Sequence, residues 1–238
     1  MQLPLPFRHP ILALCLGLSA SLASPAWAVN PQPVGDADIN AVGNVYPPGE
    51  EETGWVIGDV QSTSGSVGAI WRREPLPTGS DWSSTVHLVI LRTYPYLLSS
   101  EGLSFALQGQ GINALGAPGS SVGYDTLGAV GMVLRTATNN QIGLNTSGVA
   151  QDTRPAMMDL GHGGGVSVTA TLKYKARTHK LTLKATYIVD SHTKIASETA
   201  TIDLAARFGP TVSLGVTGST GATPSLQRVY NWVVDLDR

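Results

Sequence analysis

The sequence has 238 residues, of which 42% are hydrophobic and only 13% are charged. This charged fraction is about half of the roughly 25% that is typical of globular proteins. Fifteen Lys and Arg residues nearly balance seventeen Asp and Glu residues, which leaves a formal net charge of -2. Such a balance excludes the basic face of a nucleic-acid-binding protein and a polybasic membrane-surface module, and the apolar content excludes global disorder.

The first 28 residues have the three parts of an export signal. Arg8 supplies a positive charge, an apolar stretch covers residues 11–22, and an A-W-A cleavage site occupies residues 26–28. The apolar stretch is shorter than the about 20 residues that a transmembrane helix needs. A buried N-terminal helix is the alternative, but the prolines within the segment disfavour it. We therefore expect a signal peptide over residues 1–28 and a secreted or periplasmic mature chain that begins at Val29 and has no membrane span.

The only cysteine of the sequence, Cys15, lies inside this signal. Removing 28 of the 238 residues leaves 210 residues without a thiol. An exported protein without disulfides depends on its hydrophobic core alone, and a chain of this length can bury a sufficient one. This combination indicates a bacterial type of exported protein.

The mature chain shows the period-two alternation of β-strands and no convincing helical period. Apolar side chains alternate with Ser, Thr and Lys over residues 166–174 and again over residues 181–187, with a polar turn at residues 177–179 between them. Two such segments joined by a short turn predict an antiparallel hairpin with one wet face.

The remaining elements expected along the chain are short strands separated by loops rich in Gly, Ser, Asn and Pro. The strands are expected at residues 67–71, 85–92, 103–107, 130–136, 142–144, 197–202, 212–216 and 229–235, and one helical turn at residues 204–208. Residues 29–53, which are rich in Pro, Gly and acids, are expected to form an extended leader. Residues 54–238 then form one all-β domain, a sandwich or a barrel.

Two motifs point toward an esterase, but their context does not. Residues 119–123 fit G-x-S-x-G, and residues 161–165 read H-G-G-G preceded by Gly. A nucleophile elbow needs a helix directly after the serine, and the HGGG loop should precede that serine in the chain. Neither condition holds, so we expect Ser121 to be a turn residue. The central strands also lack the paired carboxylates of a glycosidase, and no enzyme activity is expected.

Six segments in register resemble the legume-type (L-type) lectins. The segment S-E-G-L-S-F-A-L at residues 100–107 resembles the family's A-D-G-L-A-F-x-L strand, and residues 119–127 resemble its G-G-Y-L-G-L loop. Residues 129–144 are similar to its V-A-V-E-F-D-T…N…H-I-G-I block. The segments 168–183, 212–221 and 229–234 are similar to three later strands of the family, and the resemblance covers residues 54–236.

This resemblance implies a concanavalin A-like jelly roll of two antiparallel sheets, with sugar-binding loops above the curved sheet. It also assigns the carbohydrate site by position. Glu101 stands where the family has an aspartate that accepts hydrogen bonds from sugar hydroxyls. Gly123 lies in the loop whose backbone N–H approaches the sugar, although Gly119 fits that alignment equally well. Asn139 stands at the family's asparagine, which contacts both calcium and sugar.

The resemblance further implies a calcium ion beside a transition-metal ion, and here the sequence departs from the family. Val133 and Arg135 replace the Glu and Asp of E-F-D-T, and Gln141 replaces the metal-binding histidine. Hard cations need several oxygen ligands, and a permanently charged guanidinium repels them. We therefore expect no metal and no other cofactor. Arg135 is expected to replace the ion and to organise the loop that carries Asn139, unless it simply extends into solvent.

The sequence thus predicts an exported lectin-like module that binds a glycan or polysaccharide without a metal. The alternative is a structural, protein-interaction or adhesion sandwich that has lost its sugar site and forms a homo-oligomer through a flat sheet.

Overall fold

A computed structural model describes residues 32–49, 54–58, 65–92, 101–136, 141–153, 165–189, 192–221 and 225–236. The predicted signal peptide and its cleavage point lie outside these ranges. Within them the chain is almost entirely β-structure, with four 3-10 turns and one short α-helix, α1 (Leu204–Phe208). None of the helices in these ranges has the length and apolar character to cross a membrane.

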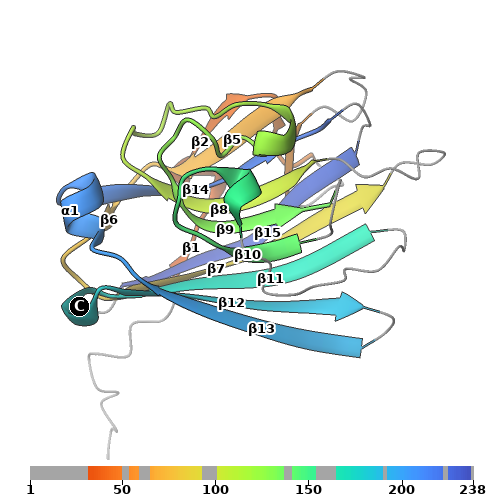
Figure 1. Ribbon diagram of the computed structural model, residues 1–238. Coiled ribbons are helices and arrows are strands. Elements are labelled where there is room, and N and C mark those ends of the chain that lie inside the picture. Colours follow the sequence, from red (N-terminus) through yellow and green to blue (C-terminus); the bar gives the residue numbers. More distant parts are fainter. Residues whose placement is uncertain are drawn as a thin grey trace, which may run out of the picture.

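The described strands form two antiparallel sheets that pack face to face (Figure 1). The back sheet has the order β13-β12-β11-β7-β15-β4-β3, with β1 paired to β15. Its strands are β1 (Gln32–Pro33), β3 (Val45–Tyr46), β4 (Trp55–Ile57), β7 (Trp82–Arg92), β11 (Gly165–Lys175), β12 (Lys180–Val189), β13 (His192–Thr201) and β15 (Ser225–Leu236).

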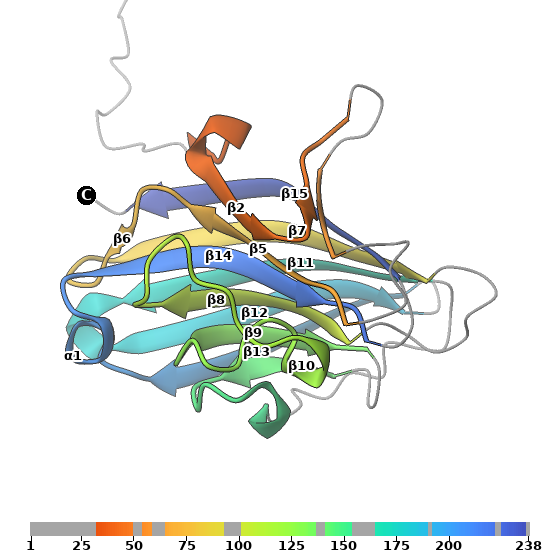
Figure 2. The same ribbon diagram turned by 90° about the horizontal axis from the view of Figure 1, so that it is seen from above.

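The front sheet has the order β10-β9-β8-β14-β5-β2, with β6 paired to β14. Its strands are β2 (Ile39–Gly43), β5 (Val67–Arg72), β6 (Leu76–Pro77), β8 (Gly102–Gln108), β9 (Val130–Arg135), β10 (Gln141–Asn145) and β14 (Thr211–Ser219). Figure 2 shows this sheet from above, with α1 at one end of β14. All the strands and the helical turn expected from the sequence are present, so the predicted all-β sandwich of two antiparallel sheets is confirmed.

The predicted hairpin is formed by β11 and β12. Val168 pairs with Tyr187, and the register continues without a break to Lys175 and Lys180. Burial alternates residue by residue along β11, as the period-two pattern requires. The turn closes through His179, whose φ of 51° is left-handed. The alternation therefore determined which face of this hairpin enters the core.

The main core fills the space between the two sheets. Large apolar side chains from both layers are fully buried there, among them Ile57, Leu88, Phe105, Leu172 and Leu214. Trp232 of the back sheet meets Phe105 of the front sheet edge to face, with 6.0 Å between the ring centres. Burying one such side chain stabilises the fold by about 1.5–3 kcal/mol, so the layers hold together without a disulfide.

The described part of the expected leader belongs to the sandwich. Strand β2 pairs with β5 in the front sheet, strand β1 pairs with β15 in the back sheet, and Ile39 is buried in the main core. The domain boundary expected at residue 54 is therefore wrong for these residues. The strands here are only two to five residues long and follow prolines, glycines and acids, so their pattern is too short to detect. Long-range pairing decides their conformation.

Candidate functional site

A covering segment, residues 109–128, lies over the outer face of the front sheet (Figure 2). The indole Nε1–H of Trp71 donates a 2.8 Å hydrogen bond to the carbonyl of Ala114. The hydroxyl of Thr217 donates a 2.7 Å hydrogen bond to the carbonyl of Val122. A second apolar cluster, which includes Val122, Tyr124 and Val133, is buried between the segment and the sheet. Hydrogen bonds and apolar contacts thereby attach the covering segment to strands β5, β9 and β14.

Glu101 lies directly before β8, and its carbonyl accepts a 3.1 Å hydrogen bond from the N–H of Thr136. Its side chain passes over Gly221, where an added methyl group would lie 2.6 Å from Glu101 Oε1. The side chain is half-buried. Within the described ranges its carboxylate makes neither a hydrogen bond nor an ion pair, so both of its oxygens are available as acceptors.

Gly123 and Gly119 both use their backbone N–H groups inside the protein. Gly123 is buried, has a φ of 70°, and donates to the carbonyl of Ala117 at 3.0 Å. Gly119 donates to the hydroxyl of Ser219 at 2.7 Å. A ligand can use either amide only by replacing one of these hydrogen bonds. The role predicted for Gly123 therefore stays a prediction, as does that of Asn139, which lies outside the described residues.

Arg135 ends strand β9, where it pairs with Gly102 on one side and Gln141 on the other. It is only 8% exposed, and its Nε has no hydrogen-bond partner. The alternative that it extends into solvent is therefore wrong. No hydrogen bond or ion pair joins its guanidinium to Glu101, although both residues lie at the same end of β8 and β9 in the described structure. Its role in organising the loop stays a prediction.

Ser121 lies in the covering segment and takes part in its connection to the turn at residues 150–152. It lies in the 3-10 turn η2 (Gly119–Ser121), and its hydroxyl donates a 2.7 Å hydrogen bond to Asp125 Oδ2. The other oxygen of Asp125 accepts the N–H of Ala150, which begins the 3-10 turn η3 (Ala150–Asp152), at 2.6 Å. The strand–turn–helix of a nucleophile elbow is not present here, so the expected turn position of Ser121 is confirmed.

Asn145 is a polar centre that the sequence did not reveal. It is 2% exposed, and its side-chain oxygen accepts from the Tyr124 hydroxyl at 3.1 Å and from two backbone N–H groups. Its amide nitrogen donates to the carbonyl of Val149 at 2.7 Å and to the Thr153 hydroxyl at 3.0 Å. Burial holds the pKa of Tyr124 far above its ordinary range, so the phenol stays a neutral donor. The only sequence signal is an asparagine before a Thr-Ser-Gly turn.

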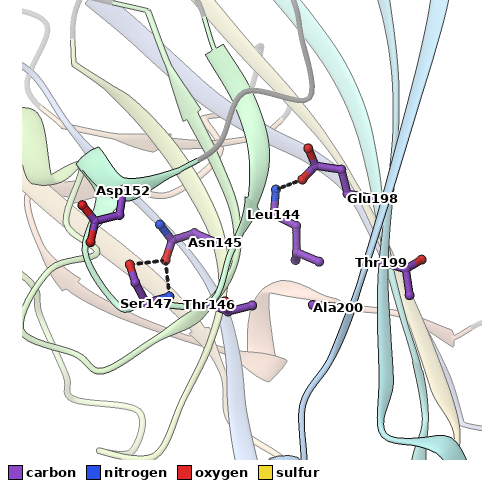
Figure 3. A pocket seen from close by; sticks show the side chains of 8 residues that line it. All are labelled: Leu144, Asn145, Thr146, Ser147, Asp152, Glu198, Thr199 and Ala200. Atoms are coloured by element: carbon purple, nitrogen blue, oxygen red, sulfur yellow. Dashed lines mark hydrogen bonds between the residues drawn. The ribbon is translucent and has the colours of Figure 1, made fainter.

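A pocket of about 570 Å³ opens between β10 and β13, at one edge of the sandwich (Figure 3). Glu198 Oε2 crosses from the back sheet and accepts the N–H of Leu144 at 2.6 Å. This bond satisfies an edge amide of the front sheet that no strand covers. Asn145 also borders the pocket, but its amide is fully engaged. The pocket therefore lies along a seam that the Glu198–Leu144 hydrogen bond spans, and we assign no ligand to it.

The described residues at the positions of the implied metal pair do not fit it. Val133 is completely buried in the second apolar cluster, and Arg135 places a buried permanent cation where the family has a carboxylate. No cluster of three or more His, Cys, Asp or Glu side chains able to hold a metal ion occurs among the described residues. A second positive charge beside an unpaired buried guanidinium is electrostatically unfavourable. Val133 and Arg135 therefore provide no ligands for the implied ions.

The fold is that of the legume lectins, the concanavalin A-like sandwich. Lectin I from Ulex europaeus, in complex with the methyl glycoside of α-L-fucose, superposes with a TM-score of 0.69 at 18% identity, covering 83% of this chain and 91% of that lectin. Peanut lectin with a nine-residue peptide gives 0.67 at 17% identity over 85% and 93% of the two chains. Arcelin-5, a lectin-like defence protein from Phaseolus vulgaris, gives 0.68 at 17% identity over 84% and 93%.

A scan of protein-family models finds no match to the sequence, and a search of curated proteins finds none either. At identities of 17–18%, the structural likeness establishes the fold and leaves the ligand open.

Proposed function

We propose that the protein is a non-enzymatic, carbohydrate-binding lectin-like module whose site lies around Glu101. The observation that carries this proposal is the half-buried carboxylate of Glu101, which lies over Gly221 and has no partner among the described residues. Sugar hydroxyls donate hydrogen bonds to carboxylates, and hydrogen bonds to a charged partner contribute about 1.5–3 kcal/mol each. Asn139 and the Gly119–Gly123 turn complete the proposed site.

The direct test is a glycan array probed with the purified protein, repeated with the Glu101→Ala variant. We expect at least one glycan class to bind the parent protein and not the variant. Binding that is equal for both proteins would move the site away from Glu101. An array without any bound glycan would favour the alternative function, an interaction or adhesion sandwich.

That alternative has one supporting observation of its own. Ile188 and Ile195 are 60% and 63% exposed, and both lie on the outer face of neighbouring back-sheet strands. Two large apolar side chains that lie close together on the solvent-exposed face of a sheet favour self-association. If the array is empty, sedimentation analysis of the parent protein and of Ile195→Lys decides whether this face joins two copies.

Arg135 gives a prediction about divalent ions. If its buried charge replaces the metal, glycan binding and the melting temperature will be unchanged by EDTA and by millimolar calcium. Arg135→Ala will weaken both, because a buried cation that orders a loop is lost. Isothermal calorimetry and thermal unfolding provide the two measurements. A melting temperature that rises with calcium would contradict the proposal that the site works without a metal.

We also propose export to the cell exterior or periplasm, from the signal-like segment alone. Intact-mass analysis of the exported protein should then find an N-terminus at Val29. An exported form that retains Arg8 would contradict this.

A further inference from the structure

A second pocket, of about 290 Å³, lies on the opposite edge of the sandwich from the seam between β10 and β13. It is bordered by the 3-10 turn η1 (Asp36–Asp38), by β4, and by the middle of β15. Its walls combine apolar side chains with polar groups, among them the carboxylate of Asp36 and the amide of Asn231. Small-molecule sites likewise combine apolar walls with a few placed polar groups.

Trp55 and Asp36 form the most specific feature of this pocket. The indole Nε1–H of Trp55 donates a 2.9 Å hydrogen bond to Asp36 Oδ1. Because an indole N–H lies in the plane of its ring, the carboxylate is held at the rim of the half-buried indole. The second carboxylate oxygen has no hydrogen-bond partner in the described structure. A flat ligand on the indole face would therefore meet a fixed acceptor at its edge.

A β-bulge brings the amide of Asn231 to the same pocket. Between Tyr230 and Val233 the register of β15 against β7 shifts, and Asn231 takes a left-handed φ of 47°. The next side chain, Trp232, turns inward and donates to the Ser84 hydroxyl at 3.0 Å. Asn231 remains exposed, and its side-chain amide makes no hydrogen bond to another described residue. Bulges often re-aim a side chain toward a site, and asparagine is one of the few residues that readily take the left-handed conformation.

We propose that this pocket binds one pyranose ring, as a second carbohydrate site separate from Glu101. A pyranose has a C–H face that stacks on an indole and rim hydroxyls that reach Asp36 and Asn231. An ammonium ligand would need several open aromatic faces around it. Here the Tyr230 ring packs against Gly54, where an added methyl would lie 2.6 Å from two ring atoms, and against His87. Trp232 is buried, so the half-buried Trp55 is the aromatic side chain of the pocket that remains for a ligand.

The test uses the indole N–H signals of the ¹⁵N-labelled protein, in which each tryptophan gives one peak and Trp55→Phe assigns its own. The protein is titrated with the methyl pyranosides of glucose, galactose, mannose, fucose and N-acetylglucosamine, and separately with tetramethylammonium chloride. We expect at least one pyranoside to shift the Trp55 peak saturably while the peaks of the buried Trp71 and Trp82 stay in place. Asp36→Asn should weaken that binding about tenfold, since a charged acceptor is replaced by a neutral one.

Asp38→Asn is the matched control, because Asp38 is a second exposed carboxylate on the same turn and does not border the pocket. It should leave the titration unchanged. A Trp55 peak that no pyranoside moves, that responds only to tetramethylammonium, or that titrates equally in Asp36→Asn overturns the inference. The same titration with Glu101→Ala separates the two sites. A shift that persists there supports this pocket even if the site at Glu101 fails.

Discussion

Replacing Asn145 by alanine is expected to lower the free energy of unfolding by about 3–5 kcal/mol, a large loss for one substitution. Asn145 is only 2% exposed, and its side chain joins the end of β10 to the covering segment and to the turn that follows. Its removal takes a hydrogen-bond partner from the Tyr124 hydroxyl, the N–H groups of Ser147 and Gly148, the Val149 carbonyl and the Thr153 hydroxyl. The buried N–H of Gly148 then has no partner in the described structure, while the Tyr124 and Thr153 hydroxyls keep the carbonyls of Asn145 and Ala150.

Urea unfolding followed by tryptophan fluorescence measures this loss. Asn145→Asp should fall between the parent and Asn145→Ala, because it keeps the accepted hydrogen bonds and loses the two donated ones. Thr146→Ala is the control, since Thr146 is the exposed next residue. Its side chain should contribute less than about 0.5 kcal/mol. A similar cost for Asn145→Ala and Thr146→Ala would show that the Asn145 network does not stabilise the fold.

The second large effect is expected on binding. Glu101→Ala should weaken glycan binding at least about a hundredfold, because two or more hydrogen bonds to a charged acceptor are lost. Stability should change little, since the carboxylate has no partner within the described structure. Glu101→Asp should retain binding, because it restores the shorter carboxylate of the resembled family. Glu74→Ala is the control, since Glu74 is exposed and pairs with Arg72 at 2.6 Å. Loss of binding in Glu74→Ala as well would point to a general charge effect.

Gly221→Ala tests the same site without removing the charge. Its methyl group would lie 2.6 Å from Glu101 Oε1, so the carboxylate must move aside. We expect binding to weaken while the protein stays folded, and calorimetry with the glycan found on the array measures it. Unchanged affinity in Gly221→Ala would mean that the position of the Glu101 carboxylate above Gly221 is not the one that binds.

The sequence by itself determined the strands and the sheet faces. The alternation over residues 166–174 and 181–187 shows which side chains enter the core, because the side-chain period of a strand is two. The helical turn at residues 204–208 appears with the expected bounds. Its Asp203 accepts the N–H of Ala206 at 2.9 Å, a local capping signal that needs no distant partner. The strand pattern alone indicated a sandwich or a barrel, and the resemblance of six segments to legume-type lectin motifs indicated the lectin fold.

Only the tertiary structure decided how the site is built. The strands before residue 54 form because β15, β5 and β4 pair with them. The sequence there is too short and too rich in turn residues to predict them. Arg135 is buried by the packing of the folded chain. The N–H of Gly123 is occupied by a hydrogen bond inside the covering segment, and the network around Asn145 reaches Tyr124 of the same segment. Local periodicity reports which face a residue takes. Whether a polar group on that face is free or already bonded depends on what packs over it, and that is a property of the folded chain.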